Sequence, residues 1–119
     1  MLYLEKGNSM KQNDKNVNNI PLTDKNVLDT IHEGLAYCYG VKGLVTYENK
    51  KGKKEEDLYI HIHHDMTYSV KVHVILVPGV KITETLRSCQ KTLKFFLEHR
   101  FPKALRYLDV YGDELSSEA

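Results

Sequence analysis

The sequence lacks an excess of charge of either sign, and it lacks a long apolar run. Its 119 residues carry 17 basic and 16 acidic side chains, which leaves a formal net charge of +1. A charge this small creates no overall field that attracts nucleic acid or an anionic membrane. No apolar stretch approaches the roughly 18–20 residues of a membrane span. An export signal has a basic segment followed by an apolar one, and the opening MLYLEKGNS does not have this pattern. We therefore expect a cytoplasmic protein of one domain.

The common catalytic and cofactor motifs are also absent from the sequence. It contains no glycine-rich nucleotide loop, no nucleophile elbow and no HExxH pair. Its two cysteines, Cys38 and Cys89, have no CxxC spacing, and both fall on the apolar stripe of a predicted helix. That placement is typical of reduced core thiols. We predict a protein that is not an enzyme and uses no cofactor.

Hydrophobic periodicity predicts two helices. Thr23 offers an N-cap before apolar residues at helical spacing, and Gly40 is placed to end that helix. Gly34 falls inside it, where glycine costs about 1 kcal/mol of helix propensity, so a close contact is expected there. A second, longer helix is predicted over 83–100, with Pro102 after its end.

Alternating apolar residues predict the strands. Segments 44–47, 58–64, 68–77 and 105–110 have this pattern, the apolar segment 20–22 offers a brief edge strand, and ENKKGKKEED is expected to be a solvated loop. The expected fold is α+β, an antiparallel sheet of about four to five strands with two helices packed on one face. The domain spans 20–112, between a disordered tail at 1–19 and a polar tail at 113–119.

Four of the six histidines fall between residues 61 and 73, which raises the question of a metal site. A register with Ile62 opposite Val70 places His61 and His73 as diagonal neighbours on the polar face, about 7 Å apart. Two imidazoles at that separation reach one zinc ion. However, Lys71 would lie directly across from His61, and neither strand carries a carboxylate to complete the site. We therefore predict no metal site and interpret these histidines as surface residues, with His61 and His73 as the pair to test.

The second helix carries an aromatic residue on its outer face. Helical spacing places Phe95 opposite the apolar stripe, among charged neighbours. It is either a scattered surface residue or an anchor for a protein partner, for which Arg87, Lys91 and Lys94 would supply polar contacts. Residues 81–106 also carry seven basic and two acidic side chains, which leaves nucleic-acid binding as the rival interpretation.

Four stretches together resemble the alkaline shock protein family, the Gls-type envelope-stress proteins of bacteria. They are IPLTDKNVLDTI, AYCYGVKGL, YSVKVHVILVPGVKITETLRSCQKTLKFFLE and ALRYLDV, and they cover about residues 19–111. The ending YGDELSSEA and the histidine-rich hairpin depart from the family pattern. The resemblance implies a small cytoplasmic protein without catalytic or cofactor-binding residues, held near the membrane only through a partner. We therefore expect a protein-interaction module in envelope homeostasis or in regulation of fatty-acid synthesis, with self-association left open.

Overall fold

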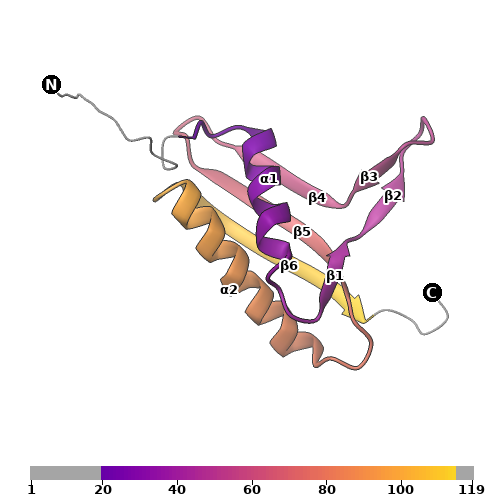
Figure 1. The fold of residues 1–119 in the computed structure, drawn as a ribbon. Helices are drawn as coiled ribbons and strands as arrows, with labels where there is room; N and C mark the ends of the chain where they lie inside the picture. The colour runs from indigo at the N-terminus through magenta and orange to yellow at the C-terminus, as the bar shows by residue number, and fades with distance from the viewer. Residues whose placement is uncertain (1–19, 115–119) are drawn as a thin grey trace, which may run out of the picture.

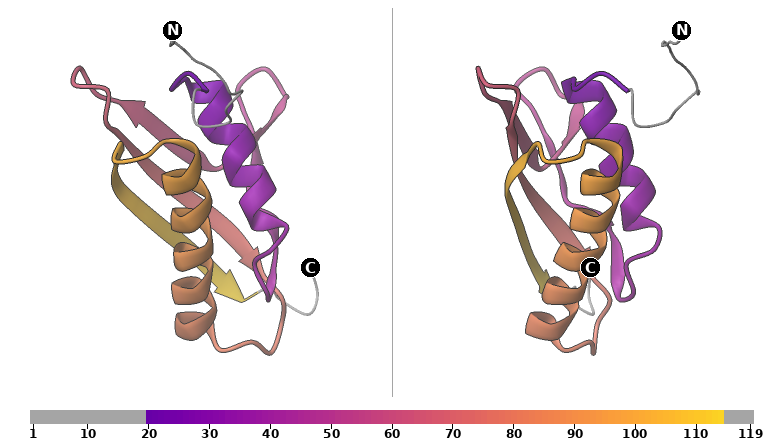
Figure 2. Two further views of the ribbon diagram at one scale, coloured as in Figure 1. Left: turned by 60° about the vertical axis from the view of Figure 1, so that its left-hand side comes forward. Right: turned by 90° about the vertical axis from the view of Figure 1, so that its left-hand side faces the viewer.

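The computed structural model describes residues 20–114, in which two helices lie on one face of a sheet (Figures 1 and 2). The elements are α1 (Asp24–Leu35), β1 (Val41–Leu44), β2 (Thr46–Glu48), β3 (Lys54–Glu56), β4 (Leu58–Ile62), β5 (Tyr68–Leu76), α2 (Ile82–Arg100) and β6 (Leu105–Glu114). The expected α+β class, with two helices on one face, is confirmed. The tail predicted at 1–19 and residues 115–119 lie outside the described residues, and β6 runs two residues past the predicted end of the domain.

Helix α1 begins where the sequence predicts. The Thr23 side-chain oxygen accepts a hydrogen bond from the Asn26 backbone N–H at 3.1 Å, which caps the first turn. The helix ends at Leu35, well before Gly40, which adopts φ 81° in the following turn. Segment 20–22 forms no strand, in contrast to the sequence expectation.

Strand β5 is the centre of the sheet. β1 and β4 pair antiparallel with successive halves of β5, whereas β6 pairs with it in parallel along its whole length. The expectation of a wholly antiparallel sheet therefore fails at β6. The reason is the long helix α2, which returns the chain to the start of β5 and so makes a βαβ crossover.

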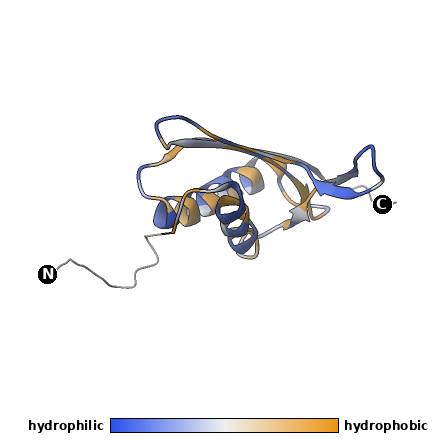
Figure 3. Ribbon diagram, turned by 90° about the horizontal axis from the view of Figure 1, so that it is seen from above, coloured by the Kyte–Doolittle hydropathy of each residue, from blue (hydrophilic) through white to orange (hydrophobic). Residues whose placement is uncertain are grey.

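β1 and β4 act as one strand interrupted by a hairpin. Val45 N–H donates to the His73 carbonyl at 2.9 Å, and His73 N–H donates to the Asp57 carbonyl at 3.0 Å. Asp57 N–H also donates to the Val45 carbonyl at 2.7 Å, so the chain leaves the sheet and rejoins it at one point. The departing segment is the β2–β3 hairpin, whose hydrophilic residues project from the sheet (Figure 3). The sequence expectation treated most of this hairpin as a loop.

The β4–β5 register differs from the expected one by two residues. Ile60 lies opposite Val70, and Ile62 opposite Tyr68. The turn explains the shift, because the Asp65 carboxylate accepts hydrogen bonds from both the backbone N–H (3.1 Å) and the hydroxyl (2.6 Å) of Thr67. A shift of two keeps every side chain on its predicted face while changing its cross-strand partner.

The core lies between the sheet and the helices. Every second residue of β5 is fully or almost fully buried toward α1 and α2. These side chains meet the apolar stripes of the two helices, and the buried cluster is completed by Val27, Ile31, Cys38, Leu44, Cys89, Leu93, Leu97, Phe101 and Leu108.

Tyr68 is the largest fully buried side chain, and its hydroxyl has no hydrogen-bond partner among residues 20–114. Its ring packs edge-on against Phe101, with centroids 5.7 Å apart. Burial raises the pKa of Tyr68 well above its usual value, because removal from water disfavours the ionised form of the hydroxyl.

We expect Tyr68→Phe to increase the free energy of unfolding by about 1 kcal/mol, because it removes a buried unpaired hydroxyl and keeps the ring. Urea denaturation measures the change. Tyr59→Phe on the exposed face is the control and should change nothing, whereas a loss of stability in Tyr68→Phe would contradict the prediction.

Candidate functional site

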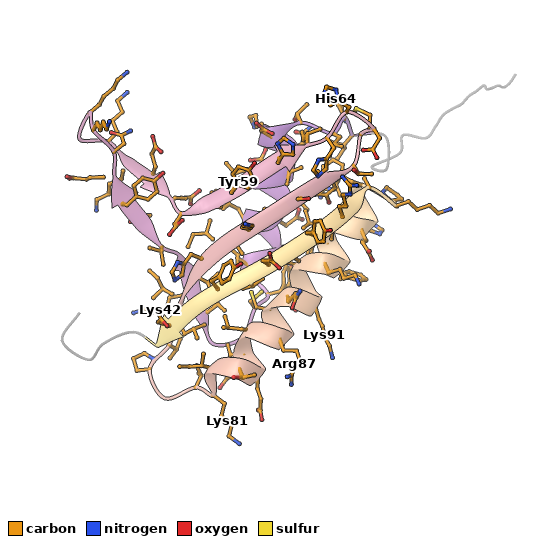
Figure 4. The ribbon with its side chains drawn as sticks, turned by 180° about the vertical axis from the view of Figure 1, so that it is seen from behind. Lys42, Tyr59, His64, Lys81, Arg87 and Lys91 are labelled. Atoms are coloured by element: carbon orange, nitrogen blue, oxygen red, sulfur yellow. The ribbon has the colours of Figure 1, made fainter. Side chains whose placement is uncertain are left out.

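The sheet face turned away from the helices carries three of the six histidines, His61, His63 and His73. Tyr59 and His61 on β4 alternate with the core-facing residues of that strand, and Lys71 and His73 do the same on β5. Figure 4 shows this face from outside, with Tyr59 on it and His64 at the turn between β4 and β5. The predicted division of YIHIHHDM into core and surface residues is confirmed.

The register separates the two histidines considered for zinc. His61 lies opposite Ser69 instead of Lys71, and His73 lies opposite Asp57 where the hairpin rejoins the sheet. Four positions along a strand correspond to roughly 13 Å, so the two are not diagonal neighbours. His73 Nδ1 lies 3.4 Å from Asp57 Oδ2, so a carboxylate accompanies it after all. Within residues 20–114, no group of three or more His, Cys, Asp or Glu side chains is placed to hold a metal ion.

His63 lies beside His61 on this face. Its ring lies edge-on to His61 with centroids 4.5 Å apart, and its Nε2 is 2.9 Å from the Ser69 hydroxyl. Partial desolvation, followed by repulsion from Arg106 and His61, lowers the pKa of His63 below its usual value. The neutral ring is therefore favoured near pH 7, and the face carries little positive charge from it.

Two tyrosines on this face were missed by the sequence interpretation. Tyr107 pairs with Ser69 and Tyr111 with His73, and both are at least half exposed. Their alternation with buried Leu108 was visible in the sequence. Their position next to β5 was not, because it depends on the parallel pairing of β6.

The outer face of α2 carries the predicted partner-binding residues. Arg87, Lys91 and Lys94 are exposed, and Arg87 and Lys91 project away from the sheet in Figure 4. Phe95 is 67% exposed, as its helical position predicts. The basic helix and its aromatic residue thus share one side of the molecule.

Phe95 is part of an aromatic patch, which we define as Tyr37, Phe95, Phe96 and His99. Tyr37, just after α1, stacks on Phe96 with centroids 5.4 Å apart. Phe95 lies edge-on to Phe96 at 5.8 Å and stacks on His99 at 6.2 Å. Tyr37 is 70% exposed, so the patch joins both helices at the surface. The sequence interpretation did not consider Tyr37 at this surface.

An ion pair fixes the helices beside this patch. Arg100 Nη2 donates to Glu33 Oε1 at 2.9 Å and so joins α2 to α1. Exposed pairs of this kind contribute little to stability. Arg100 directly follows His99 of the aromatic patch in α2, so the ion pair joins the two helices beside the patch.

The two cysteines are buried and free, as the sequence predicts. Cys38 lies after the end of α1 and not on the helix itself, and its thiol lies 3.5 Å from the Gly34 carbonyl. The hydrogen bond with Cys38, together with burial, raises the pKa of the Cys89 thiol. A thiol held in its neutral form is a poor nucleophile.

Comparison with known proteins identifies the fold. No protein-family model and no curated protein matches the chain. Similar solved structures include a MamM-CTD variant at TM-score 0.55 and 12% identity, which covers 79% of this chain and 100% of that one. The zinc form of another MamM CTD variant matches at TM-score 0.54 and 12% identity, covering 80% and 89% of the two chains. A further MamM variant matches at TM-score 0.56 and 13% identity, covering 77% and 85%. At this identity the similarity establishes the arrangement of helices and strands.

Neither helix of the described part of the chain is long and apolar enough to cross a membrane.

Proposed function

We propose that this chain is a non-catalytic protein-interaction module that binds a protein partner through the aromatic patch. The observation that carries the proposal is the stacking of Tyr37 on Phe96 with Phe95 edge-on beside them, at the surface of both helices. Rings held by their neighbours lose little conformational freedom on binding, and aromatic residues and arginine dominate protein interfaces. Exposed Lys91 and Lys94 give the patch a basic rim.

The cellular role proposed for this module is in envelope homeostasis, through peripheral contacts with a partner protein. The support is the resemblance of IPLTDKNVLDTI, AYCYGVKGL and the 68–98 segment to the alkaline shock protein family. The described fold accommodates these segments as α1, the turn into β1, and the β5–α2 unit. A partner in regulation of fatty-acid synthesis remains the alternative within the same proposal.

The experiment is an affinity pull-down from native cells with the wild-type chain and with Phe95→Ala. We expect the variant to recover the main partner with about tenfold lower affinity, because truncation of an interface aromatic costs about 1–2 kcal/mol or more. Since Phe95 is 67% exposed, the free energy of unfolding should change by no more than about 0.5 kcal/mol. Quantitative binding of the recovered partner and urea denaturation measure the two effects.

Tyr39→Ala is the matched control, because Tyr39 is an aromatic residue that is 85% exposed and makes no ring contact with Tyr37, Phe95, Phe96 or His99. Equal partner recovery by the wild type and Phe95→Ala, with Tyr39→Ala also unchanged, would contradict the proposal. Size-exclusion chromatography of the same variants tells whether the partner is a second copy.

Nucleic-acid binding remains the second candidate, and the tyrosines of the open sheet face favour it. Tyr59 on β4 and Tyr107 and Tyr111 on β6 are all at least 50% exposed and lie on either side of β5 on one face of the sheet, an arrangement on which bases can stack. However, the basic residues of α2 lie on the helical side, so one strand of nucleic acid would have to pass around β6 to contact both. Salt-dependent binding of single-stranded RNA that is lost in Lys91→Glu, Lys94→Glu would favour this candidate over the first.

A further inference from the structure

The free edge of β4 has hydrogen-bonding groups directed away from the sheet. His73 N–H bonds to the Asp57 carbonyl, and His63 N–H bonds to the Thr67 carbonyl at 2.7 Å. In an antiparallel pair, hydrogen-bonded positions alternate, so Tyr59 and His61 also direct their backbone groups toward β5. The N–H and C=O groups of Leu58, Ile60 and Ile62 therefore point outward. Among the described strands, only β5 pairs with β4.

A shallow apolar groove lies beside this edge. It has a volume of about 380 Å³ and lies between α1 and β4, lined by Leu28, Leu58 and Ile60, with Asp24 and Lys25 at its polar end. Leu58 and Ile60 are only partly buried, in contrast to the fully buried residues of β5. The same residues thus offer outward backbone groups and apolar side chains with space beside them.

The opposite edge of the sheet is different. On β6, the Gln90 side chain of α2 donates a hydrogen bond to the Leu108 carbonyl at 2.8 Å. Acidic residues follow at Asp109 and Asp113. Side chains that cap backbone groups and charges along an edge are the usual protection against added strands. β4 carries no proline and no lysine between Leu58 and Ile62.

We propose that the β4 edge binds an extended peptide segment of another protein, which adds to the sheet as a further strand. Backbone hydrogen bonds to Leu58, Ile60 and Ile62 would supply the affinity. Apolar side chains at alternate positions of the peptide enter the groove beside Leu28, while the intervening ones lie next to Tyr59 and His61. This surface is separate from the aromatic patch, and the proposal does not depend on it.

The shape of the edge favours a narrow peptide over a second folded copy of the chain. The free strand is five residues long. At its start the β2–β3 hairpin projects from the sheet past this edge, as Figure 1 shows. At its other end the chain turns at His64–Met66, where Met66 has φ 66°. A single strand fits between these two projections, whereas a whole domain approaching edge-on meets the hairpin first.

The test uses the full chain and a short, acetylated and amidated peptide in which valine alternates with threonine and lysine. We expect binding with a Kd on the order of 100 µM, which is typical of a weak peptide contact. Ile60→Pro removes an outward N–H without breaking a β4–β5 hydrogen bond, and should weaken binding about tenfold. Leu28→Gln leaves the β4 backbone intact and should also weaken binding, so the test holds even if the proline variant fails to fold. Tyr39→Ala, at an exposed position outside both the β4 edge and the aromatic patch, is the control that should bind as the wild type does.

Amide hydrogen exchange provides the second measurement. In the free protein, the N–H groups of Leu58, Ile60 and Ile62 should exchange faster than those of Tyr59 and His61, and the peptide should slow them. Equal peptide affinity in the wild type and Leu28→Gln, or no binding below about 1 mM, overturns the proposal. Protection of the outward groups without peptide also overturns it. Protection that rises with protein concentration would indicate a second copy at this edge, and protection independent of concentration would indicate that the chain covers the edge itself.

Discussion

Replacing Gly34 with valine is expected to lower the free energy of unfolding by about 2–3 kcal/mol. A Cβ added at Gly34 would lie 2.9 Å from Leu93 Cδ2 and 3.4 Å from the Phe96 ring, closer than carbon atoms approach without displacement. Leu93 is fully buried and Phe96 supports the aromatic patch, so neither can move freely. The better helix propensity of valine recovers only a fraction of a kcal/mol. Crowding between α1 and α2 therefore outweighs the gain in helix propensity, and the net effect of Gly34→Val is a loss of stability.

Leu93→Ala tests the same contact from the other helix. Alone it should destabilise the protein by about 2–5 kcal/mol, because it removes buried methyl groups and leaves a cavity. In the double variant Gly34→Val, Leu93→Ala, the valine side chain enters that space. The combined loss should therefore be smaller than the sum of the two single losses by about 1 kcal/mol or more.

Urea denaturation of the two single variants and the double variant measures this coupling. Ala36→Val, at an exposed position after the same helix, is the control for the valine side chain alone and should change stability by no more than about 0.5 kcal/mol. Additive losses in the double variant would mean that Gly34 and Leu93 do not share the contact that the structure describes.

Gly112→Val is expected to cost about 3 kcal/mol, the upper part of the range for overpacking. A Cβ at Gly112 would lie 2.8 Å from the Val74 backbone oxygen, 2.9 Å from Val74 Cγ2 and 3.2 Å from Leu86 Cδ2. The carbonyl belongs to the central strand β5, so it cannot rotate away as a side chain can. β6 must instead separate from β5 at this end, with loss of the contact to α2.

Asp113→Val is the matched control for Gly112→Val. Asp113 is the next residue of the same strand and is exposed, since successive side chains of a strand point to opposite faces. Thermal and urea denaturation should show a large loss for Gly112→Val and little change for Asp113→Val. Equal stability of the two variants would refute the close packing of β6 against β5 and α2.

The periodicity of the sequence was sufficient to predict the helices, the main strands and the face on which most of the side chains of β4 and β5 lie. The 83–100 prediction corresponds to α2 within one residue, and the 58–64 and 68–77 predictions correspond to β4 and β5. The outward position of Phe95 was also predicted correctly. These features depend on whether a residue is apolar and on the 3.6- and 2-residue periods, both of which are local properties.

Predicting the candidate sites required the strand register and the contacts between helices, which the local sequence pattern does not specify. His61 and His73 were weighed as zinc ligands, and rejected, in a register that is wrong by two residues. The Asp65–Thr67 contacts that set the true register are made by side chains in the turn. Helical spacing identified Phe95 as exposed. It did not predict that Tyr37, which follows α1, stacks on Phe96 of α2, because that contact depends on how the two helices pack. The β2–β3 hairpin was missed because its residues are mostly polar and exposed, so no apolar alternation marks its strands.

The sequence by itself determined that this chain has two amphipathic helices and a sheet with one polar face, because burial of apolar stripes leaves few other arrangements. Tertiary structure alone decided that β6 runs parallel to β5, that β1 and β4 form one interrupted strand, and which backbone groups of β4 remain free. The physical reason is that a periodic pattern specifies which side of an element faces the core. Pairing partners and edges are set by contacts between residues far apart in the chain, and the proposed binding surfaces are made of those contacts.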